Sequence, residues 1–357
     1  MRIKHGKTKY GSEGLYSSRS FQNLNLPPEV NRTLATTANQ ALCKKSWGSY
    51  KTAISMLDRC LAEYREELTL PLPERLVTLY VAWLLDRKLS VGTIRAYLSG
   101  VRTLHLISGV DPPNTRSPAI QHILTGKENA ENRDKKKGKK KMRLPMTPDL
   151  MKILKRELIN SNMENQDRAC FWSVATLAFA GGFRISELLC KETNEFDPDY
   201  TLLRKDISLK QPARGKESLQ VKVKCDKTNR THLAVIIDIF NTGSALCPVK
   251  AFKGYSRAVT GEKTDQPAFR LASGAALTAR KLNNFIKLAL TPHLGNVNGF
   301  LSSHSFRIGI TSLLGQSGMS TEELKTIGRW SSSAYEFYLK LPRTSRLRLA
   351  EKVSSLI

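Results

Sequence analysis

The segment at residues 181–189 (GGFRISELL) carries side chains spaced to hold an oxyanion. A Gly-Gly turn there leads into a predicted helix with Arg184 in its first turn and Glu187 three residues later on the same face. A guanidinium can bind two phosphate oxygens at once, and a neighbouring carboxylate can hold that fork in place. The plainer interpretation is an ordinary helix start with an i,i+3 ion pair.

Two later segments carry groups that suit phosphoryl transfer. His304 and Arg307 are one helical turn apart, which would place a proton-transferring imidazole beside an anion-binding guanidinium. Trp330 offers an indole N–H donor, and Tyr335 and Tyr338 follow it within a short predicted helix. Taken alone, these segments also fit a surface histidine beside a solvated arginine and a set of core aromatic residues.

Apolar periodicity predicts the elements that must position these side chains. Spacings of three and four residues predict amino-terminal helices over 41–68, after Pro73, after an N-cap at Ser90 and briefly over 120–124. Beyond an N-cap at Thr147, the predicted helices are 147–158, 167–180, 184–189, 248–259, 278–290, 304–314, 321–327 and 334–341. Alternating stretches predict three antiparallel strands over 202–209, 219–225 and 232–237. The predicted fold class is mainly α with a small antiparallel β-sheet (α+β).

The charge of the chain points to a polyanionic partner. Its 57 Lys and Arg against 31 Asp and Glu give a net charge of +26, a surplus that repels itself unless it faces a polyanion. The run at 135–143 (KKKGKKKMR) holds seven of these charges, and its removal would still leave +19. The cysteines and histidines show no metal-ligand spacing, so we expect reduced thiols and no metal. The longest uncharged apolar stretch, 169–183, is shorter than the about 20 residues of a membrane span.

The order of these motifs resembles a known family. The second half reads G-x-R-x-x-E-L, a lysine on a predicted sheet, H-x-x-R, Trp and Tyr. Over residues 145–340 this constellation resembles the catalytic domain of the tyrosine recombinases, or phage-integrase family. Residues 89–101 (LSVGTIRAYLSGV) resemble the family's helical core-binding domain. The surroundings of His304 and the run Gly328-Arg329-Trp330 are most similar to recombinases of eukaryotic mobile elements, the Crypton and DIRS-like groups.

The resemblance implies a role for each matched residue. Tyr338 would be the nucleophile that attacks a DNA phosphodiester and leaves a 3′-phosphotyrosine, with neither ATP nor a metal. Arg184 and Arg307 would clamp the nonbridging oxygens and stabilise the charge of the transition state. His304 would serve in proton transfer, and Trp330 would donate its N–H to the phosphate.

Two of these assignments leave alternatives open. The family's sheet lysine protonates the leaving 5′-oxygen, and Lys227 matches its position best, with Lys222 and Lys224 as neighbours on the preceding strand. Tyr335 is the rival nucleophile, because it lies three residues before Tyr338. Glu187 is expected to support Arg184.

The remaining expectations concern DNA and assembly. The expected domains are a poorly ordered basic arm (1–35), a helical core-binding, SAM-like domain (36–128), a basic linker (129–145), the catalytic domain (146–342) and a tail (343–357). The two folded domains would close on duplex DNA as a C-shaped clamp. The expected DNA contacts are Lys135, Lys136, Lys137, Lys139, Lys140, Lys141 and Arg143 of the linker, and Arg95 and Arg102 of the helical domain. The lysine run also fits a nuclear-localisation signal, and the host compartment would be the nucleus.

The tail and the overall activity complete the interpretation. In this family such a tail docks on a neighbouring protomer, which implies a homotetramer on two DNA sites; the alternative is a helix packed on its own domain. The expected function is a site-specific recombinase that integrates or excises a mobile element. A type IB topoisomerase-like nicking-closing enzyme and a domesticated DNA-binding protein that no longer cuts are the alternatives.

Overall fold

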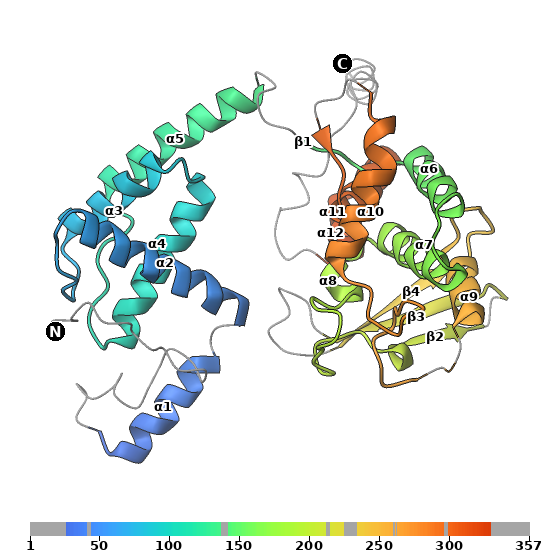
Figure 1. Cartoon of the computed structure of the whole chain (residues 1–357), viewed down its shortest axis with the longest axis horizontal. Coiled ribbons are helices and arrows are strands. Elements are labelled where there is room, and N and C mark those ends of the chain that lie inside the picture. Colours follow the sequence, from blue (N-terminus) through green and yellow to red (C-terminus); the bar gives the residue numbers. More distant parts are fainter. Residues whose placement is uncertain are drawn as a thin grey trace. The chain divides into compact units, whose positions relative to one another are not determined.

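The computed structural model describes residues 26–40, 44–136, 142–211, 215–224, 234–259, 261, 263–295 and 299–329. The chain divides into two compact units, 1–139 and 140–357 (Figure 1). Each unit has its own cluster of buried apolar side chains.

The first unit is helical. Its helices are α1 (Pro28–Gln40), α2 (Lys44–Glu63), α3 (Glu74–Asp86), α4 (Val91–Ile107) and α5 (Pro118–Lys136). The predicted N-cap of α4 is confirmed, because the Ser90 side chain accepts a hydrogen bond from the Thr93 N–H. α2 packs on both α3 and α4, and buried residues at helical spacing on all three form the core.

The boundaries of the first unit correct two predictions. α1 begins at Pro28, so the end of the predicted 1–35 arm is helical. α5 continues to Lys136, well beyond the predicted short helix over 120–124 and into the predicted linker. The absence of apolar periodicity after Gly126 suggested a loop. Lys, Glu, Ala and Arg favour helix without needing a buried face, and they extend α5 past its last buried apolar residues.

The second unit combines helices with a three-stranded antiparallel sheet. The sheet has the order β2-β3-β4, with β2 (Ile207–Lys210), β3 (Ser218–Val223) and β4 (Val235–Phe240) in register Ile207↔Val221↔Ile237. Its helices are α6 (Pro148–Ile159), α7 (Asn165–Ala180), α8 (Ile185–Leu188), α9 (Pro248–Ala258), α10 (Ala279–Leu290), α11 (His304–Gln316) and α12 (Thr321–Gly328). The buried helix α7 contacts α8 and α11, which carry residues of the candidate site (Figure 1). The predicted fold class, mainly α with a small antiparallel sheet, is confirmed.

A short parallel pair anchors the start of this unit. β1 (Met142–Arg143) pairs with β5 (Gly299–Phe300), just before α11. The Met146 N–H then donates to the Ser305 carbonyl at 2.9 Å. A Cβ on Gly309 would lie 1.9 Å from the Met146 carbonyl oxygen, so only glycine allows α11 to approach this closely.

No described helix is long and apolar enough to cross a membrane. Within the same residues, no group of three or more His, Cys, Asp and Glu side chains is placed to hold a metal ion.

Candidate active site

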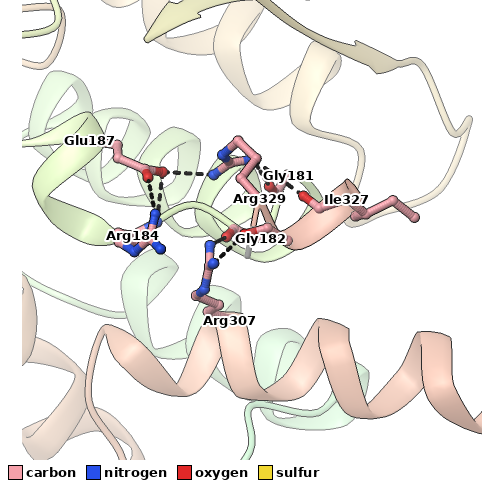
Figure 2. Close-up of polar contacts among 8 residues, drawn as sticks. Gly181, Gly182, Arg184, Glu187, Arg307, Ile327 and Arg329 are labelled. Atoms are coloured by element: carbon pink, nitrogen blue, oxygen red, sulfur yellow. Dashed lines mark hydrogen bonds and ion pairs between the residues drawn. The ribbon is translucent and has the colours of Figure 1, made fainter. Parts of the chain in front are cut away.

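Arg184 is held by the turn that precedes α8. Gly182 has φ +55°, a left-handed conformation that favours glycine, and it reverses the chain after α7. Arg184 is the N-cap of α8, and its backbone N–H donates to Oε2 of Glu187 at 2.9 Å. Its Nη1 donates to Oε1 of Glu187 at 3.0 Å (Figure 2). The predicted i,i+3 pair is therefore present, with the Arg184 side chain 18% exposed and that of Glu187 only 2%.

Arg307 connects this turn to two further elements. It lies one turn into α11 and is 1% exposed. Its Nη1 donates to the Gly182 carbonyl and its Nη2 to the Gly328 carbonyl at the end of α12 (Figure 2). The alternative of a solvated arginine in the H-x-x-R segment is therefore wrong, because this guanidinium is buried and donates to two backbone carbonyls.

His304 begins α11 among several positive charges. Burial is the main cause that lowers its pKa to about 4, and the positive charges of Arg143, Arg307 and Arg184 lower it further. All three guanidiniums therefore act on one imidazole. At neutral pH the ring is uncharged, so it can accept a proton.

Arg143 is part of this group of charges. The β1–β5 pair places it opposite Phe300, and its guanidinium lies 5.3 Å from the centre of that ring. The sequence suggested a linker residue that contacts DNA. The structure places it in the second unit, where its charge acts on His304, and its DNA contact stays a prediction.

Arg329 is a site residue that the sequence analysis left without a role. Its Nη2 donates to Oε2 of Glu187 at 2.7 Å, and its guanidinium lies 5.1 Å from the centre of the Phe183 ring. It has φ +53° directly after α12. The sequence offers no signal for this role, because the neighbouring Gly328 is itself the residue type expected to end the helix.

The sheet lysines differ in what they contact. Nζ of Lys224 pairs with Oδ2 of the buried Asp206 at 2.7 Å and also donates to the Pro198 carbonyl at 2.9 Å. This ion pair gives Lys224 a structural role. Lys222 is exposed on β3. Lys227 follows the end of β3 in the sequence and lies outside the described residues.

The structure leaves several predicted residues unplaced. Trp330, Tyr335, Tyr338 and the tail 343–357 lie outside the described residues, as do Lys137, Lys139, Lys140 and Lys141. Lys135 and Lys136 end α5. Arg95 and Arg102 are both exposed on α4, two turns apart, and Arg95 forms an ion pair with Glu128 at 3.1 Å.

This geometry is suited to an anionic reaction centre. Arg184, Arg307 and His304 come from two segments far apart in the sequence, and α11 and the Gly182 turn hold them together. Guanidiniums fixed before the reaction stabilise charge that develops on a phosphate without reorganising. A neutral imidazole beside them can take up a proton.

Comparisons with known proteins identify the fold of the chain. No protein-family model and no curated protein matches the sequence. Several solved structures do match in fold. One is a lambda integrase dimer bound to a COC′ core site, with TM-score 0.57 and 14% identity over 87% of this chain and 94% of that chain. The Tn1549 transposon integrase in complex with circular intermediate DNA gives TM-score 0.56 and 13% identity over 87% and 94%. The XerH recombinase bound to palindromic difH gives TM-score 0.58 and 13% identity over 96% and 90%. The chain therefore has the tyrosine recombinase fold.

Proposed function

We propose that the chain is a member of the tyrosine recombinase family, a site-specific recombinase that cuts and rejoins DNA strands. The observation that carries this proposal is the joining of Arg184 and His304–Arg307 around one glycine turn. The same two arginines and histidine belong to the motifs by which the sequence resembles this family. The matching fold belongs to integrases and recombinases whose structures contain DNA.

The proposed reaction is a pair of transesterifications. The Tyr338 hydroxyl attacks the scissile phosphorus, a 3′-phosphotyrosine bond forms, and the 5′-oxygen leaves. The neutral His304 accepts a proton, and Lys227 gives one to the leaving oxygen. Arg184, Arg307 and the Trp330 indole stabilise the phosphate charge. Attack by a 5′-hydroxyl from a second strand then reverses these steps and releases the tyrosine.

The guanidinium of Arg307 can both bind backbone carbonyls and stabilise the charge of the phosphate. A guanidinium has five N–H donors, and the bonds to the Gly182 and Gly328 carbonyls involve one on each terminal nitrogen. Those bonds fix the plane of the group, so that its charge is already oriented when DNA binds. This preorganisation is why a buried arginine suits the proposed clamp.

The net charge of +26 supports a DNA substrate beyond the reacting phosphate. We propose that the helical unit and the catalytic unit close on duplex DNA, with the linker lysines on phosphates. The active assembly would be a homotetramer on two sites, joined through the tails. The biological substrate would be the ends of a mobile element, of the Crypton or DIRS-like kind, in a nucleus.

A two-site plasmid assay tests this proposal. The full chain is incubated with a supercoiled plasmid that carries two copies of the ends of the element that encodes it, and the products are sequenced. A recombinase yields rearranged circles with precise junctions. Relaxed but unrearranged plasmid would instead indicate a topoisomerase-like enzyme, and tight binding without any cleavage would indicate a DNA-binding protein.

A further inference from the structure

We propose that Arg329 is a positioning residue for strand cleavage, which acts by holding Glu187 and thereby orienting the guanidinium of Arg184. The inference rests on the proposed function and adds a residue to its site. Arg329 follows α12 directly, and Trp330 is the next residue in the chain.

The contacts of Glu187 are the first step of the argument. Oε1 accepts from Nη1 of Arg184 at 3.0 Å, whereas Oε2 accepts from the Arg184 backbone N–H at 2.9 Å and from Nη2 of Arg329 at 2.7 Å (Figure 2). The carboxylate is 2% exposed, so water does not compete for these oxygens. A single buried carboxylate thus pairs with two guanidiniums, and Arg329 makes the shorter of the two side-chain bonds.

The backbone of Arg329 is the second step. Its φ of +53° is left-handed, and at the residue after a helix glycine adopts this conformation with least strain. If this residue only ended α12, glycine would serve at least as well. An arginine is explained by what its side chain does, which is to reach Glu187 and the Gly181 carbonyl across the site.

The consequence for Arg184 is the third step. A carboxylate and a guanidinium left to themselves favour a bidentate pair that uses both oxygens. Arg329 and the Arg184 backbone N–H occupy Oε2, so the Arg184 side chain is confined to Oε1. Without Arg329, we expect the Arg184 fork to turn onto both oxygens and away from a bound phosphate.

Replacement of Arg329 by glycine distinguishes the contribution of its side chain from that of its backbone conformation. Arg329→Gly keeps a residue that accepts the left-handed conformation and removes the guanidinium. Lys88 provides a control for the backbone change, because it is another non-glycine residue with a left-handed φ after a helix (+57°). It is exposed and lies in the other unit. Arg329→Lys keeps the charge but not the planar fork.

Two measurements are made on the full chain. The first is the single-turnover rate of covalent adduct formation on a nicked suicide duplex at saturating concentration. The second is the NMR signal of the Arg184 Nε–H group in DNA-free protein with labelled arginine, assigned by its loss in Arg184→Lys. For Arg329→Gly we expect an adduct rate about a hundredfold lower, as for other displacements of a reacting group by about 1 Å. We also expect a shifted Arg184 signal and a melting temperature lowered by the loss of the ion pair with the buried Glu187.

The comparison variants complete the test. Arg329→Lys should restore part of the rate, and Lys88→Gly should change neither the rate nor the Arg184 signal. An Arg329→Gly protein that cleaves at the wild-type rate, or whose Arg184 signal does not move, would overturn the proposal. If the wild-type chain formed no adduct at all, the proposed function would fail, and the Arg184 signal would still decide whether Arg329 orients Arg184.

Discussion

The buried guanidinium of Arg307 donates to the carbonyl of Gly182, a residue 125 positions earlier in the chain. Its other terminal nitrogen donates to the carbonyl of Gly328. One side chain thus fixes the start of α11, the turn before Arg184 and the end of α12. Arg307 should therefore matter for stability as well as for cleavage.

Alanine substitutions of Arg184 and Arg307 should lower the free energy of unfolding by different amounts. Arg307→Ala leaves two buried carbonyls without their donors and should lower the free energy of unfolding by about 3 to 5 kcal/mol. Arg184→Ala removes a partly exposed side chain whose partner Glu187 keeps Arg329, so we expect a loss of about 1 kcal/mol. Urea denaturation measures both. Both variants should fail to cleave DNA, and equal losses of stability would contradict the structural role of Arg307.

Two glycines should respond to alanine in opposite directions. At Gly309 a Cβ would meet the Met146 carbonyl oxygen at 1.9 Å, so Gly309→Ala should destabilise the chain by at least about 2 kcal/mol. Gly254 lies on the exposed side of α9 with no atom within 4 Å of an added Cβ. Gly254→Ala should therefore raise stability by roughly 0.5 to 1 kcal/mol. Thermal unfolding of the two variants checks this, and a destabilised Gly254→Ala would contradict the predicted environment of α9.

The pH dependence should reflect the lowered pKa of His304. The folded protein has this pKa at about 4, against an ordinary value of 6.5. Below pH 6.5 the unfolded chain binds the proton more readily, so this histidine makes stability fall as the pH falls from about 6.5 to 4. The ring stays neutral at pH 6, and its NMR signals should not titrate between pH 6 and 8.

Arg143→Gln provides the control for that titration. The variant removes one of the positive charges that lower the pKa of His304, so the midpoint should move upward. A wild-type midpoint near 6.5, or no movement in the variant, would contradict the burial of His304 beside Arg143.

A substrate with a better leaving group should show which sheet lysine protonates the leaving 5′-oxygen. The Lys227→Met protein should fail to cleave an ordinary duplex. It should still cleave a duplex with a 5′-bridging sulfur, because a thiolate leaves without protonation. Lys224→Met should lose stability through the broken pair with Asp206 while it keeps cleavage of the ordinary duplex. Rescue by sulfur in Lys222→Met instead of Lys227→Met would reassign the general acid.

The sequence was sufficient to locate the helices and strands that have strong local signals. Apolar spacing and caps located α4, with its cap at Ser90, and α6, with its cap at Thr147. Alternation located the three strands of the antiparallel sheet, but the first begins at Ile207 and not at 202, because Arg204–Asp206 form a 3₁₀ helix. The polar end of α5 was missed because its helix depends on propensity and not on a buried face.

At the candidate site, the residue types could be predicted but not their contacts. The spacing of Arg184 with Glu187 predicted their ion pair, because the two residues are one turn apart. The bonds from Arg307 to Gly182 and from Arg329 to Glu187 join residues that are distant in the sequence. No local pattern encodes such contacts, since they arise only when α7, α11 and α12 have packed.

Covalent trapping tests the central claim most directly. The full chain is incubated with a nicked suicide duplex built from the ends of the element that encodes it, beside Tyr338→Phe and Tyr335→Phe, and denatured products are separated by size. We predict a slow-migrating DNA–protein adduct with the wild type and with Tyr335→Phe, and none with Tyr338→Phe. Tight, salt-sensitive binding without an adduct, on this duplex and on randomised ones, would contradict the recombinase assignment.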